Sequence, residues 1–212
     1  MAQSTRFREL RTRLSALRRH MLPATFSPVG DYSERQLDRA RGYRLLAHAE
    51  IESFIEDVTL QAAKKKISVW TTNKTPSDLV VCLIAHYHSG FDVDEEGVEP
   101  VFPASSRPKV RDEIKEIVDV AFRQYVTIQN NNHGVREKNI KRLILPIGVR
   151  RDEIDPTWLT NLDEFGKQRG ATAHSSKKAQ QQIDPQAELQ NVQNLLEGFA
   201  KLDVIITALG EQ

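Results

Sequence analysis

Helical spacing of apolar residues is the feature that most restricts how this chain can fold. Between Phe7 and Ile206, apolar side chains recur at intervals of three or four residues, whereas the strict alternation expected of a half-buried strand is almost absent. The longest such segment runs from Ser33 to Lys66, and Ser33 is a good N-cap residue. The sequence therefore predicts an all-α protein that contains one long helix.

Other helices are expected on both sides of this long one, bounded by proline, glycine and capping residues. They are predicted over residues 4–21, 75–87, 110–130 and 135–144, from Pro156 through Arg169, and from Pro185 to Gly210. A chain of 212 residues is long enough for one domain with a proper core. We therefore expect a basic helix and loop over residues 1–32 and one helical domain over residues 33–212, with a loop insertion at 90–108.

Composition excludes several classes of protein. The chain has 30 basic and 29 acidic residues, so any affinity for nucleic acid must come from local patches. Its single cysteine, Cys82, rules out an intramolecular disulfide and a multi-cysteine zinc site. No apolar run approaches the roughly 18 residues of a membrane span, and no signal peptide follows the start. We expect a soluble, cytoplasmic protein that makes no contact with a membrane.

The first helix, over residues 4–21, is basic and amphipathic. Arginines surround its apolar residues, which are Phe7, Leu10, Leu14, Leu17 and Met21; the arginines are Arg6, Arg8, Arg11, Arg13, Arg18 and Arg19. Three interpretations remain open. The helix could contact phosphates, it could belong to a mitochondrial transit peptide, or it could pack on the body of the protein with a solvated basic face.

A metal site is not expected. His86 and His88, followed by Asp92 and Asp94, have the chemistry of metal ligands. However, side chains two residues apart on a helix point to opposite sides, and the two carboxylates fall in a predicted loop. We therefore predict no metal and no cofactor.

The strongest functional indication is an arginine and a histidine with four small residues between them. Arg169 is a permanent planar cation that can bind a phosphate through two parallel hydrogen bonds. His174 carries a proton that is mobile near neutral pH. Together the two side chains can cleave RNA without a metal. The alternative is that Arg169 pairs with a carboxylate on a neighbouring helix and His174 is an ordinary histidine at a helix end.

The spacing of this pair predicts a homodimer. Five residues along a helix correspond to about 500°, so the side chains of Arg169 and His174 diverge by about 140°. One copy therefore makes a poor pocket. Two copies could converge across a two-fold axis, because small residues such as Gly170 allow close approach of a second helix.

Glu50 lies among the apolar residues of the long helix. At about 100° per residue it falls within the contiguous apolar arc of that helix. Glu52 and Glu56 fall on the far side of the helix, where water alone can solvate their carboxylates. A carboxylate that faces a core needs a cation, and Arg169 is the candidate partner. Glu50 is therefore a third candidate catalytic residue. The alternative is that it stays hydrated at the edge of a groove.

The short helix over residues 135–144 is basic, because it carries Arg136, Lys138, Lys141 and Arg142. These side chains either hold the phosphates of a substrate or form a solvated face without a function.

With these residues placed, the chain resembles the HEPN superfamily and, within it, the RiboL-PSP-HEPN group. Three stretches carry the resemblance: Arg41–Glu56; Asn130–Gly134 with Lys138–Ile140 and Leu145–Gly148; and Leu162–His174, which contains the Arg-x4-His pattern. The resemblance extends from about Glu34 to Ala208 and leaves the basic N-terminal helix outside. It implies an antiparallel α-helical bundle to which that helix is an addition.

The resemblance also implies an activity. Active members of the superfamily are metal-independent endoribonucleases that work as dimers in toxin–antitoxin, phage-defence and RNA-processing systems. By this resemblance, Arg169 stabilises the negative phosphorane. His174 acts as general base on the ribose 2′-OH or as general acid at the leaving 5′-oxygen, which leaves a 2′,3′-cyclic phosphate. RNA is the implied substrate, and an antitoxin or regulatory protein is a further implied partner.

Two positions differ from patterns found in the superfamily. Many members have a polar residue directly after the arginine, where this chain has Gly170, and one toxin subgroup has a tyrosine two residues after the histidine, where this chain has Ser176. The second difference argues against that subgroup and its nucleotidyltransferase antitoxin. Because a fold does not fix a function, the alternative to a nuclease is a non-catalytic HEPN module that dimerises, or that binds a nucleotide or another subunit.

Overall fold

The structure is a computed structural model that describes residues 3–87, 110–174 and 183–211. Within these ranges the chain forms α-helices and one 3-10 turn, and no strand, which confirms the all-α prediction. The elements are α1 (Thr5–Met21), α2 (Glu34–Asn73), α3 (Asp78–Tyr87), α4 (Val110–Asn130), α5 (Glu137–Ile144), η3 (Arg151–Glu153), α6 (Pro156–His174) and α7 (Pro185–Glu211). The predicted insertion at residues 90–108 lies outside the described residues. None of these helices is both long enough and apolar enough to cross a membrane.

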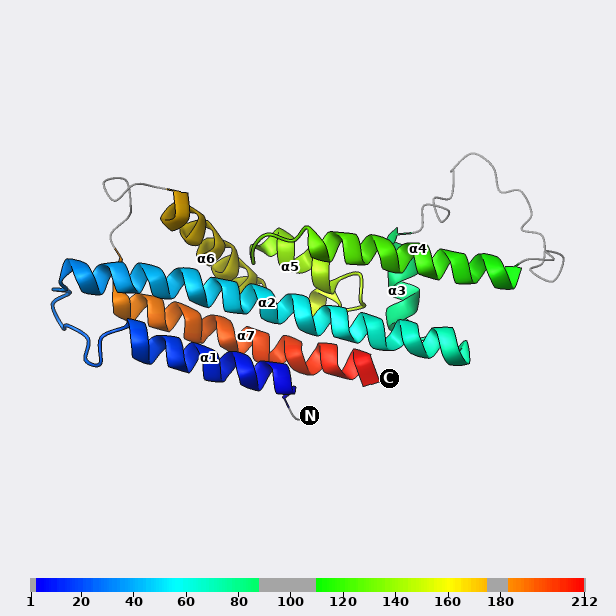
Figure 1. The fold of residues 1–212 in the computed structure, drawn as a ribbon, viewed down its shortest axis with the longest axis horizontal. Coiled ribbons are helices and arrows are strands. Elements are labelled where there is room, and N and C mark those ends of the chain that lie inside the picture. The colour runs from blue at the N-terminus through cyan, green and yellow to red at the C-terminus, as the bar shows by residue number, and fades with distance from the viewer. Residues whose placement is uncertain (1–2, 88–109, 175–182, 212) are drawn as a thin grey trace.

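Helix α2 is the axis of the bundle and contacts each of the other α-helices in the described ranges. In the view of Figure 1, α1 and α7 lie along one side of α2, and α4, α5 and α6 lie along the other. Helices α1 and α4 run antiparallel to α2, whereas α7 runs parallel with it (Figure 1). The prediction of one long helix that begins after Ser33 is confirmed.

The two ends of α2 follow from local chemistry. The Ser33 Oγ accepts a hydrogen bond from the Gln36 backbone N–H, and the Gln36 side chain accepts one from the Ser33 N–H at 2.8 Å. The helix ends where Lys74 adopts a left-handed φ of 57°. The predicted end at Lys66 was too early, because the buried side chain of Ile67 continues the apolar face beyond it.

Two Asp-Pro pairs start helices as predicted. The Asp155 Oδ1 accepts a hydrogen bond from the Thr157 N–H at 2.8 Å at the start of α6. The Asp184 Oδ1 accepts one from the Gln186 N–H at 2.8 Å at the start of α7. In each case a proline occupies the first helical position, where a backbone N–H would have no partner within the helix.

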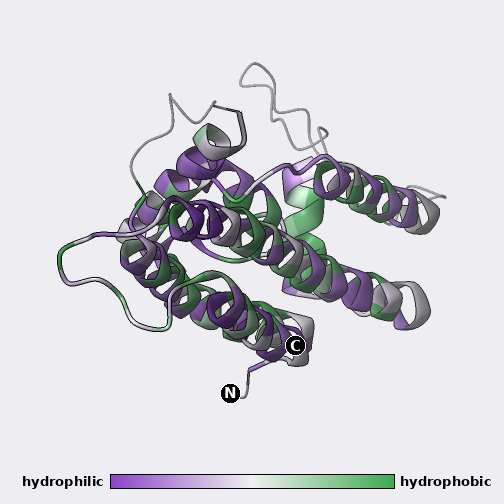
Figure 2. Ribbon diagram, turned by 60° about the vertical axis from the view of Figure 1, so that its left-hand side comes forward, coloured by the Kyte–Doolittle hydropathy of each residue, from purple (hydrophilic) through white to green (hydrophobic). Residues whose placement is uncertain are grey.

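One hydrophobic core runs through the bundle, and α1, α2 and α7 meet in part of it. The Phe54 ring of α2 packs edge-on against Phe7 of α1, with 5.6 Å between centroids, and against Phe199 of α7, with 5.9 Å. Figure 2 shows hydrophobic segments between the helices and hydrophilic segments on their outer sides. The buried residues of α1 are Phe7, Leu10, Leu14 and Leu17. Helix α1 is thus packed on the body of the protein, which is one of the three interpretations that the sequence left open.

Candidate active site

Helix α6 carries both Arg169 and His174, and it is unbroken at Gly170. Positions 169 and 174 therefore stay about 140° apart around the helix axis. The side chain of His174, and the residues Ser175 and Ser176 after it, lie outside the described part of the chain. The remainder of α6 is held by contacts on both sides of Arg169.

The middle of α6 is held through Asp163. The Arg136 Nε donates a hydrogen bond to the Asp163 Oδ1 at 2.9 Å, and the Lys167 Nζ lies 2.9 Å from the Asp163 Oδ2. Hydrogen bonds from Arg136 and then Lys167 lower the pKa of Asp163 to about 2, so this carboxylate is charged at neutral pH. Arg136 directly precedes α5, so the contact ties α5 to α6.

Gly166 allows this contact. A Cβ atom at position 166 would lie 2.6 Å from the Arg136 Cγ, so α6 can approach Arg136 closely only because residue 166 has no side chain. Gly170, one turn later, has nothing of the described chain within 4 Å of its Cβ position. Within the described chain, close packing is therefore found at Gly166 and not at Gly170.

Replacing Gly166 and Gly170 with alanine should change the free energy of unfolding in opposite directions. Gly166→Ala is expected to lower the free energy of unfolding by about 1–3 kcal/mol, because the added methyl group displaces Arg136. Gly170→Ala is expected to raise it by up to about 1 kcal/mol, because alanine favours the helix and its methyl group meets no residue of the described chain. Urea unfolding of the two variants measures both values. The reverse order of stability would contradict this packing.

The end of α6 is held by a buried ion pair between α2 and α7. The Arg44 Nε donates to the Glu188 Oε2 at 2.8 Å, and the Arg44 Nη2 donates to the Glu188 Oε1. The Arg44 Nη1 donates to the Thr172 Oγ1 at 3.1 Å. Arg44 is 8% exposed and Glu188 is 2% exposed, so the pair is almost entirely removed from water. Because Thr172 lies between Arg169 and His174 in α6, the ion pair fixes the turn that carries them.

Arg169 has no ionic partner among the residues that the structure describes. Its side chain is partly buried, and its Nε is a buried donor without an acceptor. A buried polar group without a partner is costly, so such a group in a folded protein usually has an acceptor from elsewhere. The alternative that Arg169 pairs with a carboxylate of a neighbouring helix is not seen within the described ranges.

His48 of α2 faces the same interface, and the sequence did not single it out. It is 2% exposed and stacks on Phe165 of α6, with 5.9 Å between ring centroids. Burial, and then the charge of Arg169, lower the pKa of His48 to about 4, so its ring is neutral at physiological pH. The His48 Nδ1 has no hydrogen-bond partner, and the nearest carboxylate oxygen, the Glu52 Oε2, is 3.5 Å away. Two unpartnered polar atoms thus lie between α2 and α6.

Stability should depend on pH through His48. Its pKa is about 4 in the folded chain against 6.5 for a free histidine, so the unfolded state binds more protons between these values. Stability is therefore lost as the pH falls from 6.5 toward 4, by roughly 3 kcal/mol in full. Urea unfolding at several pH values checks this, with His48→Gln as the control that lacks the titrating group. The same pH dependence in both chains would show that His48 is not buried in its neutral form.

The asparagine-rich loop before α5 is bound to α2. The Asn132 Nδ2 donates hydrogen bonds to the Glu56 Oε1 at 2.7 Å and to the Gly134 carbonyl at 3.1 Å. Burial raises the pKa of Glu56, which is a half-buried acceptor and not the solvated carboxylate that was predicted. Gly134 lies against the His48 ring, so the loop closes one end of the interface between α2 and α6.

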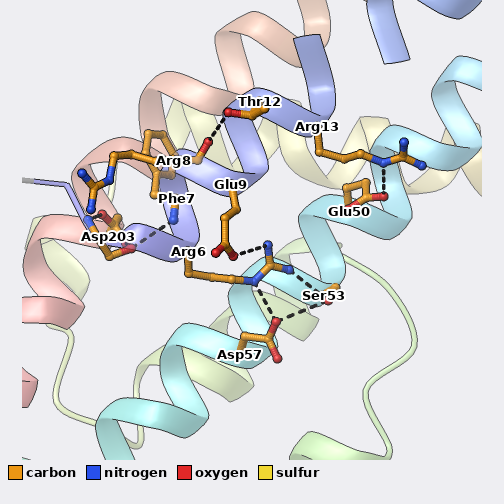
Figure 3. Close-up of polar contacts among 11 residues, drawn as sticks. Arg6, Phe7, Arg8, Glu9, Thr12, Arg13, Glu50, Ser53, Asp57 and Asp203 are labelled. Atoms are coloured by element: carbon orange, nitrogen blue, oxygen red, sulfur yellow. Dashed lines mark hydrogen bonds and ion pairs between the residues drawn. The ribbon is translucent and has the colours of Figure 1, made fainter. Parts of the chain in front are cut away.

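The predicted pair between Glu50 and Arg169 is wrong. The Glu50 Oε1 accepts a hydrogen bond from the Arg13 Nε of α1 at 2.9 Å (Figure 3). Two residues along a helix correspond to about 200°, so Glu50 faces α1 when His48 faces α6. Glu50 does have the basic partner that its place in the apolar arc requires, but the partner comes from α1. Its carboxylate is therefore not part of the candidate site.

The four basic residues predicted to bind substrate divide into two groups. Arg136 and Lys141 are engaged in ion pairs with carboxylates of this chain. Lys138 and Arg142 are exposed, and neither forms an ion pair in the described structure. The charges of the second group are therefore not balanced by a carboxylate of the described chain.

Within the described ranges, His, Cys, Asp and Glu side chains do not gather in threes that could hold a metal ion. Of the four residues with ligand chemistry considered above, His86 lies on α3. The other three, His88, Asp92 and Asp94, lie outside the described residues.

Some residues near Arg169 were not selected from the sequence, although a pattern in the sequence could have indicated them. Arg44, His48, Glu52 and Glu56 follow one another at intervals of four, which places them in one stripe along α2. The stripe begins beside the apolar arc at Arg44 and winds from there toward the far side of the helix. Thr172 and Glu188, which complete the contacts of Arg44, had no comparable signal, because only the packing of α6 and α7 brings them to α2.

The RiboL-PSP-HEPN family matches residues 8–208 of the chain. The match begins within α1, so it includes most of the basic helix that the sequence resemblance left outside. No curated protein and no solved structure matches the chain. Since the family match covers nearly the whole all-α bundle, this protein belongs to the RiboL-PSP-HEPN family.

Proposed function

We propose that this protein is a metal-independent endoribonuclease. Its HEPN family supports an RNA-related role. The observation that carries the proposal is Arg169, a partly buried arginine without an ionic partner in the described chain, on a helix that is held on both sides. A guanidinium group kept available in this way suits a phosphate, which can accept two parallel hydrogen bonds from it.

In the proposed reaction His174 takes the proton of the ribose 2′-OH, and the 2′-oxygen forms a bond to phosphorus. The bond between phosphorus and the 5′-oxygen breaks, and the 5′-oxygen takes up a proton from the protonated His174 or from solvent. The products are a 2′,3′-cyclic phosphate and a 5′-hydroxyl. Arg169 stabilises the negative charge that develops on the phosphorane. DNA lacks the 2′-OH and is therefore not a substrate.

The charges around Arg169 support this role. Arg44 is neutralised by Glu188, and His48 is neutral because its pKa is about 4. Neither side chain therefore competes with Arg169 for a phosphate between α2 and α6.

We further propose that a second copy of the chain completes the site. Arg169 and His174 are about 140° apart on an unbroken helix, so one copy does not direct both at the same phosphate. No residue that the structure describes lies within 4 Å of a Cβ at Gly170, which leaves room for a partner helix on that side of the described chain. In a two-fold homodimer with facing α6 helices, Arg169 of one protomer and His174 of its partner act on one phosphate.

Incubation of the purified protein with total RNA in excess EDTA tests the activity. We expect fragments to accumulate at the same rate with and without the chelator, and single-stranded DNA to stay intact. A requirement for added Mg²⁺ or Mn²⁺ would overturn the proposed chemistry. RNA that stays intact in every condition would instead favour the non-catalytic module.

Such an activity fits a toxin–antitoxin, phage-defence or RNA-processing role in the cytoplasm. In a toxin–antitoxin system, a second protein would restrain the nuclease until it is needed.

A further inference from the structure

Helix α1 presents an outer face whose orientation is fixed. The Ser4 N–H and the Ser4 Oγ donate hydrogen bonds to the two carboxylate oxygens of Asp203 on α7, at 2.8 and 2.5 Å. The apolar side of α1 is buried against α2 and α7. Because both the start and the apolar side of the helix are held, its opposite side stays in solvent.

Three of the six arginines of α1 are engaged within the protein. The Arg6 Nε donates to the Asp57 Oδ2 at 2.8 Å, and the Arg13 Nε donates to the Glu50 Oε1 at 2.9 Å (Figure 3). Arg18 donates to a carbonyl of the loop before α2 and lies over an aromatic ring of that loop. These three side chains hold α1 to its surroundings.

The other three arginines, Arg8, Arg11 and Arg19, are exposed and have no ion pair in the described structure. In the described chain, the guanidinium groups of Arg8 and Arg11 donate hydrogen bonds only to neutral side chains, those of Thr5 at 3.0 Å and Gln3 at 3.4 Å. Figure 3 shows the Arg8 guanidinium directed away from α2. By helix geometry the three positions fall within about 80° of one another and span about 17 Å along the axis. We call them the outer arginine row.

We propose that the outer arginine row binds the phosphate backbone of RNA, at a surface separate from the α6 site. A row of uncompensated guanidinium groups is complementary to a line of phosphates and needs no contact with the bases. Since the formal net charge of the whole chain is only +1, the attraction comes from this local row. The arginine row by itself indicates binding of a polyanion. The choice of RNA as that polyanion rests on the proposed function.

A membrane surface is a less suitable partner. A basic amphipathic helix that binds a membrane inserts its apolar side among the lipids. In α1 that side is already buried in the protein core, which leaves only the charged side. A charged side alone suits a hydrated polyanion.

Fluorescence anisotropy with a labelled single-stranded RNA tests this inference. The full chain carries His174→Ala so that the RNA is not cut, and its affinity is compared with that of the same chain with Arg8→Gln, Arg11→Gln and Arg19→Gln. Loss of three phosphate contacts should flatten the slope of log K against log salt concentration by about 2. At low salt we expect the affinity to fall roughly 10- to 100-fold.

The matched control removes the same charge elsewhere, at exposed positions on α4 and α7, with Lys115→Gln, Arg123→Gln and Lys201→Gln. Affinity that is lost in the row variant and kept in the control supports the inference. Equal losses would show that only net charge matters, and unchanged affinity in the row variant would show that the row binds no RNA; either result overturns it. Row-dependent binding to anionic phosphatidylserine vesicles, with RNA binding unchanged, would assign the row to a membrane instead. Because the experiment measures binding and not cleavage, the row can fail to bind RNA in a protein that is a nuclease. The row can equally bind RNA in a protein that does not cleave it.

Discussion

Replacing His174 with alanine is expected to slow RNA cleavage by about 10²–10⁴-fold, the usual contribution of a general acid or base. Arg169→Ala is expected to slow it by about 10²–10³-fold, because a donor that stabilises the developing negative charge is removed. Both chains should keep their fold, since Arg169 makes no ion pair in the described structure and His174 is the last residue of α6. Initial rates on a fluorogenic RNA, with circular dichroism of each variant, measure the two effects.

The control for this prediction is His20→Ala, which removes an exposed histidine from α1 and should leave the cleavage rate unchanged. Cleavage at the normal rate by His174→Ala would place the chemistry elsewhere.

Mixing the Arg169→Ala and His174→Ala chains adds a test of the dimer. If one site takes its arginine and its histidine from different protomers, mixed dimers contain one site with both residues and should recover activity that neither parent has.

Breaking the buried ion pair between Arg44 and Glu188 should have the largest effect on stability. Glu188→Gln leaves a buried guanidinium without its counter-charge and is expected to lower the free energy of unfolding by about 3–5 kcal/mol. Replacing both residues, with Arg44→Met and Glu188→Leu, should recover most of this loss, because no charge then remains buried. Urea unfolding compares the single and double variants.

The ion pair has two expected roles, which are to stabilise the fold and to fix the turn that carries Arg169 and His174. Measuring RNA cleavage separates the second role from the first. The double variant should be stable and yet cleave RNA slowly, because Thr172 loses its hydrogen bond to Arg44 and the turn between Arg169 and His174 is no longer fixed. A Glu188→Gln chain within about 1 kcal/mol of the original stability would mean that the pair is open to water.

Most of the fold was predictable because helix starts are local. Ser33 and the two Asp-Pro pairs supply capping oxygens to residues two or three positions later, so the sequence alone indicates where these helices begin. The end of α2 was harder to place, because three lysines interrupt the apolar pattern before Ile67 resumes it. The place of α1 was also open, since a basic amphipathic helix fits several environments until a partner such as Asp203 is known.

The candidate site was predictable only where it lies on one helix. The spacing of Arg169 and His174 is local, and so is the direction of Glu50 relative to the apolar arc. The helix that covers that part of the arc is decided by tertiary packing. It is α1, which supplies Arg13 as the partner of Glu50. The contacts of His48 with Phe165, and of Arg44 with Glu188, likewise join residues more than 100 positions apart.

The chemistry of the newly formed ends tests the nuclease proposal most directly. A defined RNA oligonucleotide is cut by the purified protein in excess EDTA, and the fragments are identified by mass spectrometry. Attack by the 2′-OH predicts a 2′,3′-cyclic phosphate on one fragment and a 5′-hydroxyl on the other, and no cleavage where the ribose at the cut site is replaced by 2′-deoxyribose. A 3′-hydroxyl with a 5′-phosphate, or cleavage beside the deoxyribose, would contradict the account, because water and not the 2′-OH would then be the nucleophile.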